Sequence, residues 1–419
     1  MDDLGGPFVM GVYPMLQDET CHLLAVDFDG RTWADDSAAY LEACVAYDVP
    51  AALERSRSGN GGHIWIFFDQ ALPAAVARRL GAMLLTDAME RRPELGFRSY
   101  DRFFPSQDTL PRGGFGNLIA LPLQGKPRRA GNSVFVDSDF DPIQDQWAFL
   151  AALERMALAN VESLVGAAES KGRVVGVRAV AEDDEFMTAP WQAPPSRRTP
   201  APPIGGTLPE RVELTLGDRV YVAKKGLPPG LVTRLLRLGA FQNPEFYRAQ
   251  AMRVSTYGKP RIVDCVEDGP KYIGLPRGCL ATVEASLAAL GIATSTRDRR
   301  CAGRPLTVRF CGDLRPDQKT AACALMEHDT GVLAAATAFG KTVVAAWLIA
   351  QRGVNTLVLV HREQLLHQWI ERLSEFLDID KDRLGSFSGR RKRLTGAVDV
   401  ALMQSFVRKG EVDDRVAEY

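Results

Sequence analysis

The sequence lacks any apolar run long enough to cross a membrane, which takes about 20 consecutive apolar residues. We also expect no secretory signal, because Met1 is followed by two acids rather than by a basic segment and an apolar core. The seven cysteines are scattered, odd in number and never spaced Cys-x-x-Cys, which argues against a disulfide scaffold and a zinc ribbon. We therefore expect a protein of the reducing cytoplasm without a membrane partner.

A strong charge of one sign is missing too. The 419 residues carry a formal net charge of −1, so the total charge does not mark a nucleic-acid-binding protein. The charge is unevenly spread, however, because residues 1–150 contain 13 Lys and Arg against 21 Asp and Glu, a net charge of −8. An acidic first region is consistent with a site that works with bound cations.

Proline content divides the chain, which is long enough for two or three domains. Seven prolines fall within residues 187–209, and such a segment sustains neither a helix nor a central strand. We predict a mixed α/β protein of several domains. They comprise a first domain over residues 1–186, an extended linker over 187–209, a small α+β domain over 210–310 and a third domain over 311–419.

Apolar periodicity and turn signals predict local elements in the first two domains. The predicted elements are helices over residues 73–91 and 146–160, a hairpin of residues 212–216 and 219–223, a helix over 231–238, and a helix capped by Asn243.

Aromatic and basic residues mix near the end of the predicted middle domain. They are Phe246, Tyr247, Arg248, Arg253, Tyr257, Lys259 and Arg261. Such a mixture can stack on the bases of a single strand and neutralise its phosphates. A partly buried helix with a solvated face has the same composition, so the role of this segment stays open.

Two acids continue an apolar strand near the N-terminus. Residues 23–26 predict the strand, and Asp27 and Asp29 project from one face because strand side chains alternate. Acids at such a strand end are costly to desolvate without a compensating cation, and a divalent metal compensates both at once. A solvated strand end without metal is the alternative.

A Gly-rich loop follows about one strand and one helix later. It consists of Ser58, Gly59, Asn60, Gly61 and Gly62, and it runs into a predicted strand that begins with His63. Backbone N–H groups of such a loop can hold a triphosphate, with His63 beside it. A tight turn and a core histidine are the simpler alternative. Metal-holding acids beside a phosphate-holding loop suggest nucleotidyl transfer.

These two segments resemble the first two motifs of the archaeo-eukaryotic primase superfamily. The third motif there is an apolar residue followed by Asp, which residues 135–137 match, with Asp139 and Asp141 close enough to leave the assignment open. Residues 99–105 and 113–124 resemble the primase domain of transposon-linked TOTE conflict systems, in which a primase is fused to a helicase.

The resemblance implies an α+β domain with an RRM-like catalytic core. It implies that Asp27, Asp29 and Asp137 hold two Mg²⁺ or Mn²⁺ ions, which activate a 3′-hydroxyl and stabilise the leaving pyrophosphate. The loop residues Ser58 to Gly62 and His63 would grip the triphosphate of the incoming nucleotide, with His63 counted among the catalytic residues. The expected substrates are nucleotides and a DNA template, single-stranded or duplex, and RNA stays open as a further partner.

A second phosphate site is predicted in the third domain. An apolar strand over residues 331–335 precedes a loop over 336–342 and a helix over 343–351, which is the context of a P-loop. Lys341 would reach the β and γ phosphates of ATP, and the Thr342 hydroxyl would bind Mg²⁺.

This region resembles superfamily 2 helicases, although Ala335 replaces the first glycine of the loop pattern and Ala338 stands where many helicases have glycine. The resemblance implies an incomplete RecA-like domain. Its ATP-binding residues are Gln318, which contacts adenine, together with Thr337, Gly340, Lys341 and Thr342. Its implied nucleic-acid-binding residues are His361, Arg362, Gln404 and Ser405.

The acid pair that such a domain needs for ATP hydrolysis does not follow before Tyr419. We therefore expect an N-terminal fragment whose third domain binds ATP weakly, without hydrolysis or unwinding.

The predicted function is a primase–polymerase fused to an ATP-dependent helicase or translocase. The main alternative is a non-catalytic nucleic-acid sensor that drives a translocase in a genome-conflict system. A third option is an acidic site that cuts phosphodiesters, but a nuclease has no need of a triphosphate loop.

Overall fold

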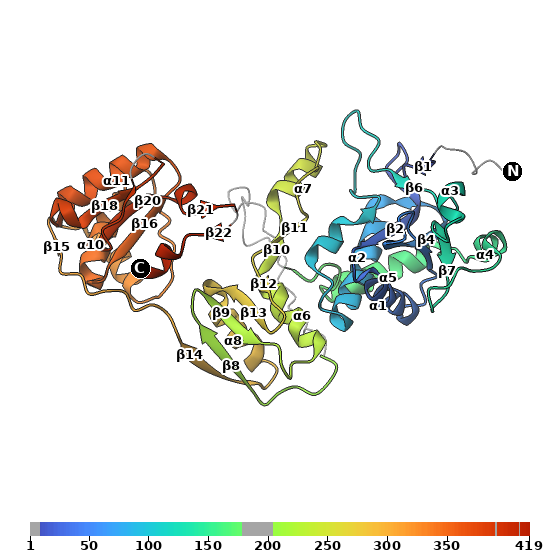
Figure 1. Cartoon of the computed structure of the whole chain (residues 1–419), viewed down its shortest axis with the longest axis horizontal. Helices are drawn as coiled ribbons and strands as arrows, with labels where there is room; N and C mark the ends of the chain where they lie inside the picture. Colours follow the sequence, from blue (N-terminus) through green and yellow to red (C-terminus); the bar gives the residue numbers. More distant parts are fainter. Residues whose placement is uncertain (1–8, 178–203, 390–391, 410) are drawn as a thin grey trace. The chain divides into compact units, whose positions relative to one another are not determined.

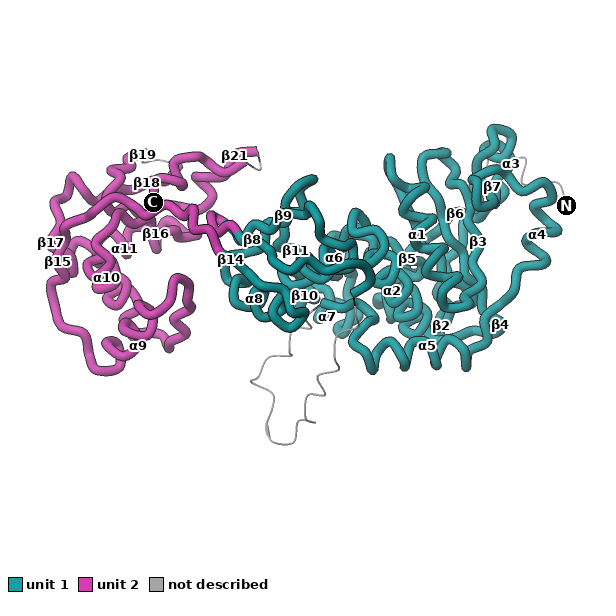
Figure 2. Tube along the Cα trace, turned by 90° about the horizontal axis from the view of Figure 1, so that it is seen from below, with its two compact units in different colours: residues 1–214, 219–295 teal, residues 215–218, 296–419 magenta. Residues whose placement is uncertain are grey.

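The computed structural model describes residues 9–177, 204–389, 392–409 and 411–419. It confirms a mixed α/β protein with more than one compact region. Contacts divide the chain into two units, one of residues 1–214 with 219–295 and one of residues 215–218 with 296–419 (Figure 2). Most of the predicted linker lies outside the described residues, and residues 204–209 form neither helix nor strand.

The first unit begins with an antiparallel five-stranded sheet in the order β5-β2-β4-β3-β7 (Figure 1). Its strands are β2 (Thr20–Asp29), β3 (Ala52–Arg55), β4 (Gly61–Pro73), β5 (Phe103–Phe104) and β7 (Val134–Val136). The predicted strand at residues 23–26 is confirmed within β2. The sheet is antiparallel throughout, so each neighbouring pair of strands runs in opposite directions.

Two helices, α1 (Trp33–Ala46) and α2 (Ala74–Arg91), cover one face of this sheet. Even-numbered β2 side chains point toward them: the ring of Phe28 lies 5.6 Å from that of Tyr40 in α1, and Leu24 packs at α2. The alternate residues Ala25, Asp27 and Asp29 therefore project from the opposite face. The predicted helix over 73–91 is confirmed as α2.

The opposite face is partly covered by the ribbon of β1 (Gly11–Val12) and β6 (Ile119–Ala120). The remaining helical segments of this region are η2 (Phe97–Asp101), α3 (Gly125–Arg128), α4 (Gln146–Ala152) and α5 (Leu158–Ser170). The predicted helix over 146–160 is thus interrupted. The chain turns extended at Leu153, and Met156 pairs with Phe68 at the edge of β4, a non-local contact that periodicity does not reveal.

The middle of the chain contributes a second five-stranded sheet in the order β12-β13-β9-β8-β14. Its strands are β8 (Arg211–Leu216), β9 (Arg219–Ala223), β12 (Glu267–Asp268), β13 (Tyr272–Pro276) and β14 (Ala293–Asp298), and a separate pair consists of β10 (Ala240–Gln242) and β11 (Ile262–Asp264). The helices are α6 (Pro229–Leu238), α7 (Pro244–Ala251), η5 (Arg277–Cys279) and α8 (Leu280–Ala288). The predicted hairpin is confirmed, and the Asn243 side chain accepts from Glu245 N–H as the predicted cap.

Residues up to 295 belong to the same compact unit as the first sheet, whereas the sequence suggested a separate domain over 210–310. Helix α6 packs on α2, where the Thr233 hydroxyl donates to the Met89 carbonyl. The Arg237 guanidinium also donates to the Tyr100 hydroxyl at 3.2 Å. Local sequence patterns predict helices and strands but not which of them pack together. The packing of α6 on α2 therefore could not be predicted from the sequence.

The second unit contains a sheet in the order β16-β20-β18-β19, in which the first three strands are parallel. Its strands are β15 (Arg309–Phe310), β16 (Thr356–Val360), β17 (Leu377–Asp378), β18 (Leu384–Phe387), β19 (Lys392–Arg393), β20 (Val398–Leu402), β21 (Val407–Arg408) and β22 (Glu411–Val412). Its helices are α9 (Pro316–Met326), α10 (Lys341–Arg352), α11 (Glu363–Phe376), η6 (Lys381–Arg383), η7 (Met403–Ser405) and η8 (Asp414–Glu418).

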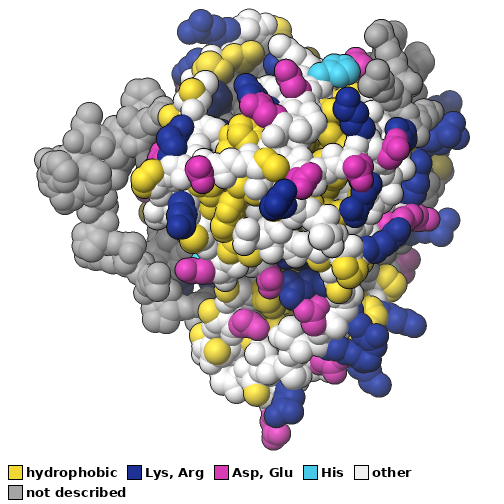
Figure 3. Space-filling view, turned by 90° about the vertical axis from the view of Figure 1, so that its left-hand side faces the viewer, with side chains coloured by type: hydrophobic (Ala, Val, Ile, Leu, Met, Phe, Trp, Pro, Cys, Tyr) yellow, Lys and Arg dark blue, Asp and Glu magenta, His cyan; other side chains and the backbone are white. Residues whose placement is uncertain are grey.

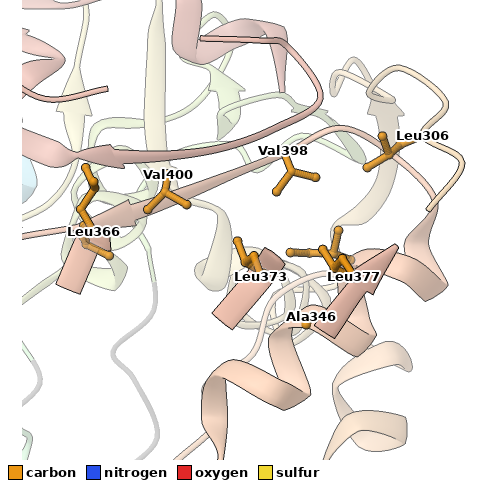
Figure 4. Packing of buried hydrophobic residues seen from close by; sticks show 9 residues of the cluster. Leu306, Ala346, Leu366, Leu373, Leu377, Val398 and Val400 are labelled. Atoms are coloured by element: carbon orange, nitrogen blue, oxygen red, sulfur yellow. The ribbon is translucent and has the colours of Figure 1, made fainter. Parts of the chain in front are cut away.

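Apolar side chains of α10, α11 and β20 point toward one another and form the core of this unit (Figure 4). Leu373, Val398 and Val400 are fully buried there. The predicted strand over residues 331–335 is wrong, because this segment forms no strand in the structure and Val332 is 90% exposed. An apolar run becomes a strand only where a neighbouring strand accepts its backbone hydrogen bonds. Strand β16 pairs with β20 and not with residues 331–335.

Candidate functional site

One row of residues crosses the first sheet at the end of β2. The register pairs Asp27 with His63, His63 with Glu54, and Glu54 with Phe135. Directly paired residues of neighbouring strands place their side chains on the same face. The pairing therefore gathers an acid of β2, a histidine of β4 and an acid of β3 on the face opposite α1 and α2.

Arg102 bridges the two acids of β2. Its Nη1 lies 3.1 Å from Asp27 Oδ2 and 3.0 Å from Asp29 Oδ2, and its carbonyl accepts from Asp27 N–H at 3.0 Å. The prediction that both carboxylates share a face is thus confirmed. One cationic group satisfies both acids, so the arrangement has the charge and donor set that suit a shared divalent cation.

His63 is held between two carboxylates. Its Nδ1 lies 3.0 Å from Glu54 Oε2 and its Nε2 lies 3.6 Å from Asp27 Oδ1. Burial opposes protonation of the ring, but the hydrogen bond and charge of Glu54 outweigh it, so the pKa of His63 is raised. The ring is thus oriented with Nδ1 toward Glu54 and Nε2 toward the acids of β2.

Glu54 is 2% exposed and has three side-chain partners. Besides His63, Trp65 Nε1–H donates to it at 2.9 Å and the Ser133 hydroxyl donates at 3.3 Å. A buried carboxylate is stable only when hydrogen-bonded in this way. Its neighbour Asp27 is less completely compensated: burial raises the pKa of Asp27 despite the opposing charges of His63 and Arg102.

The Gly-rich loop is a closed turn. The N–H of Gly59 donates to the Ser56 carbonyl at 3.0 Å, and the N–H of Asn60 donates to the Ser58 hydroxyl at 3.2 Å. Gly61 and Gly62 belong to strand β4 rather than to the loop. A Cβ on Gly61 would lie 2.7 Å from Asp29 Oδ1, so this glycine leaves room for the carboxylate.

The structure does not bring Asp137 to the other two acids. Phe135 of β7 lies in the same row as Asp27 of β2. Because β7 runs antiparallel to β2, Asp137 lies on one side of that row and Asp29 on the other. Three strand spacings of about 4.8 Å already separate that row's ends by about 14 Å. Asp137 instead accepts from the N–H groups of Asp139 and Asp141. Among the described residues, no cluster of three or more His, Cys, Asp or Glu side chains is arranged to hold a metal.

Sequence reasoning did not assign a role to Glu54 or Arg102, although both contact the predicted site. A buried Glu within the apolar strand Ala52–Arg55 was the available signal for the first, because an acid there needs partners. For Arg102 the signal was its place in residues 99–105, one of the segments that carried the family resemblance.

The P-loop of the second unit precedes helix α10. Gly340, with φ +87°, caps the helix, and the Lys341 ammonium donates to the carbonyl of Ala336 at 2.8 Å. Gln318 is buried and donates to the Phe339 carbonyl at 2.7 Å, so it braces the loop. Thr337 is exposed and Thr342 lies in the first turn of α10. The predicted ATP-binding residues thus lie on or against one loop.

The two predicted nucleic-acid-contacting motifs meet at the ends of parallel strands. β16 and β20 pair in register, and Gln404 Nε2 donates to the His361 carbonyl at 3.2 Å. Arg362 is exposed beside them and Ser405 is half-buried. Figure 3 shows Lys and Arg interspersed with Asp and Glu on the face it displays, so no uniformly basic surface marks that face.

The aromatic and basic mixture of residues 246–261 divides between interior and surface: Phe246 and Arg261 are buried, whereas Arg248, Arg253 and Tyr257 are exposed. Arg261 is 7% exposed, and its guanidinium lies 4.4 Å from the Phe246 ring centre. Its Nη2 donates to the Ser106 carbonyl at 3.2 Å, and its N–H donates to Asp101 Oδ1 at 2.9 Å. Of the two readings left open, packing accounts for Arg261 and Phe246, whereas Tyr257 is 95% exposed.

Known families match both ends of the chain. Residues 1–164 match the family described as "TOTE conflict system, Archaeo-Eukaryotic Primase domain". Residues 312–417 match the family described as "Type III restriction enzyme, res subunit". Among the helices of the described residues, none has the length and hydropathy to cross a membrane.

Individual relatives match shorter stretches of the chain. A putative DNA 3'-5' helicase Rad25 of Halobacterium salinarum is 36% identical over 92 residues, which are 22% of this chain and 15% of the relative. The DNA 3'-5' translocase XPB2 of Sulfurisphaera tokodaii is 29% identical over 103 residues, 25% of this chain and 23% of the relative. The chain thus spans less than a quarter of the length of these relatives. The crystal structure of the UvsW helicase from bacteriophage T4 aligns with a TM-score of 0.33 at 12% identity, covering 46% of this chain and 75% of that one.

Proposed function

Because this chain joins a primase-like domain to a superfamily 2 helicase/translocase domain, as its sequence predicted, we propose that its first unit catalyses template-directed nucleotidyl transfer. The observation that carries the proposal is the row of Asp27, His63 and Glu54 with Asp29 beside it. Two adjacent carboxylates compensated by one cationic side chain form a donor set for a divalent metal, and His63, hydrogen-bonded to Glu54, lies beside them.

Asp27 and Asp29 would hold Mg²⁺ or Mn²⁺ once Arg102 moves aside. The metal supplies Lewis-acid stabilisation to the attacking 3′-hydroxyl and the leaving pyrophosphate. His63, oriented by Glu54, would contact the triphosphate through Nε2, and the exposed Ser58 and Asn60 line the turn beside it. The antiparallel course of β7 argues against Asp137 as a third ligand of the same ion.

We further propose that the second unit binds ATP through Lys341 and Thr342, with Gln318 bracing the loop. Its partner would be DNA, contacted by His361, Arg362, Gln404 and Ser405. Support for this comes from the match of residues 312–417 and from the names of the relatives, a putative DNA helicase and a DNA translocase.

A nucleic-acid sensor without catalysis is the second candidate for the first unit. Arg102 favours it, because a guanidinium of the chain itself that pairs with both acids can replace a metal permanently. The same acids would then serve only the stability of the fold.

Synthesis on a single-stranded template separates the two candidates. The full chain would be incubated with a primed or unprimed DNA template, labelled NTPs or dNTPs, and Mg²⁺ or Mn²⁺, beside an Asp27→Asn/Asp29→Asn variant. We expect a metal-dependent product that the variant makes at least about a thousandfold more slowly, since removing a metal site removes most of the stabilisation of the transition state. Equal inertness of both proteins, with template binding retained, would support the sensor.

A further inference from the structure

Residues 109–136 form a stretch without a single Asp or Glu inside the acidic first region. We call these residues the acid-free segment. It carries four cationic side chains, Arg112, Lys126, Arg128 and Arg129, and all four are exposed. In the described part of the chain none of the four forms an ion pair, whereas Arg78, Arg92 and Arg102 of the same region all pair with carboxylates.

Exposed aromatic and apolar side chains accompany these cations. Phe115 is 67% exposed and Leu118 is 53% exposed. The ring centre of Phe115 lies 5.5 Å from that of Tyr13, which is itself 45% exposed. Two exposed, neighbouring rings are a platform on which nucleic-acid bases can stack.

The aromatic end of the acid-free segment is held beside the candidate active site by hydrogen bonds of Asn117. Asn117 accepts from Ser106 N–H at 2.9 Å and donates to the Phe103 carbonyl at 3.2 Å. Phe103 pairs with Val26, the residue before Asp27. The ribbon that contains Ile119 covers the same sheet face from which Asp27 projects.

The cationic end of the segment is connected to the same site by a chain of hydrogen bonds. Gln124 N–H donates to the Ser133 hydroxyl at 3.2 Å, and that hydroxyl donates to Glu54, which orients His63. Gln124 also donates to the Met10 carbonyl at 2.8 Å, so helix α3 with its cations stays beside the β1–β6 ribbon that precedes Tyr13.

We propose that the acid-free segment, together with Tyr13, binds single-stranded nucleic acid and guides it past the carboxylates. Unpaired cations neutralise phosphates, and the rings stack on bases without regard to sequence. This assignment rests on the proposed nucleotidyl transfer, for which it supplies the template path. It places nucleic-acid contact within the sheet domain that carries Asp27 and Asp29.

Binding of fluorescently labelled oligothymidylate to the full chain, measured by anisotropy in EDTA, tests the proposal without requiring synthesis. The first variant is Lys126→Ala/Arg128→Ala/Arg129→Ala. The matched control is Arg211→Ala/Lys225→Ala/Lys271→Ala, which removes three exposed cations elsewhere in the same unit. We expect the first variant to lower the slope of log affinity against log salt concentration by about 2, since each lost phosphate contact contributes about 0.7. The control should leave the slope unchanged.

The stacking platform is tested by Phe115→Ala, with Phe115→Trp to retain the ring. We expect a loss of affinity of roughly 5- to 100-fold for the alanine variant, because stacking of one base contributes about 1–3 kcal/mol, and little loss for the tryptophan variant. Oligouridylate in a parallel series shows whether RNA is accepted as well as DNA.

Three outcomes would overturn the proposal: affinities of both segment variants equal to wild type, equal losses in the control, or duplex DNA that competes as well as the single strand. None of these depends on catalysis. A chain that makes no product but binds through the acid-free segment would therefore refute the proposed transferase and leave this surface standing.

Discussion

The candidate sites of the two units are built in opposite ways. In the first unit, side chains of three separate strands converge, namely Asp27 of β2, His63 of β4 and Glu54 of β3, and Arg102 joins them from just before β5. In the second unit, one continuous loop and the helix after it supply nearly all the predicted ATP-binding residues, and Gln318 braces the loop from helix α9. A site made across strands depends on register, whereas a loop site depends on a local turn.

This difference has an energetic side. The first site gathers charges that burial destabilises, so each must be compensated by another side chain. The second offers backbone N–H groups at the start of a helix, which attract phosphate without a buried charge. Substitutions in the first site should therefore change both stability and function, whereas those in the second should change ligand binding alone.

The largest effect is expected at Glu54. Glu54→Ala leaves Trp65 Nε1–H and the Ser133 hydroxyl without their buried acceptor and opens a cavity, so we expect about 2–4 kcal/mol of lost stability. Glu54→Gln keeps an acceptor and should cost less. Denaturant unfolding measures both, and Glu42→Ala on exposed α1 surface is the control. A Glu54→Ala variant as stable as the control would show that the buried row is not a stabilising unit.

Lys341 tests the other side of the comparison. Lys341→Ala should weaken ATP binding roughly 10- to 100-fold, because a charge-assisted contact to phosphate contributes about 1.5–3 kcal/mol. Its ammonium is exposed and touches only loop carbonyls, so the unfolding midpoint should hardly change. Fluorescent-nucleotide titration measures the first quantity. Unchanged affinity would contradict an ATP site at this loop.

A smaller effect is expected at Gly61. Its Cβ would lie 2.7 Å from Asp29 Oδ1 and 2.8 Å from the Phe28 carbonyl, so Gly61→Ala must displace the carboxylate or the strand. We expect a loss of about 1–3 kcal/mol and weaker metal binding. Gly166→Ala, in helix α5 with nothing within 4 Å, is the matched control. Equal stability of the two variants would mean that β4 can accommodate a Cβ at residue 61 beside Asp29.

The smallest expected effect is a gain in folding stability, in the variant Asp27→Asn. Burial raises the pKa of Asp27 above its unfolded value, so its charged form destabilises the folded state. Protonated Asp27 contributes fully to folding stability below the pKa that the acid has in the unfolded chain, near 4. This contribution is lost as the pH rises through the pKa of Asp27 in the folded protein. Asp27→Asn should therefore be slightly more stable than wild type at pH 7, with no gain below pH 4. Thermal unfolding at both pH values checks the sign.

The comparison also explains what the sequence could predict. Contiguous signals succeeded for the strand over residues 23–26 with two acids on one face, for Asn243 as a cap, and for the helix that follows the loop over 336–342. Non-local features did not follow from any local pattern. Register decides that Phe135 rather than Asp137 shares a row with Asp27, and tertiary packing decides that Arg261 is internal and that residues 331–335 are not a strand.

We propose that the metal site consists of Asp27 and Asp29 on one face of the sheet, without Asp137. Fe²⁺ exchanged for Mg²⁺, with ascorbate and peroxide, cuts the backbone close to where the ion is bound, and mass spectrometry locates the cuts. The account predicts cleavage around residues 27–29, 61–63 and 102, all absent in Asp27→Asn/Asp29→Asn. Cleavage concentrated around residues 137–141 would contradict it.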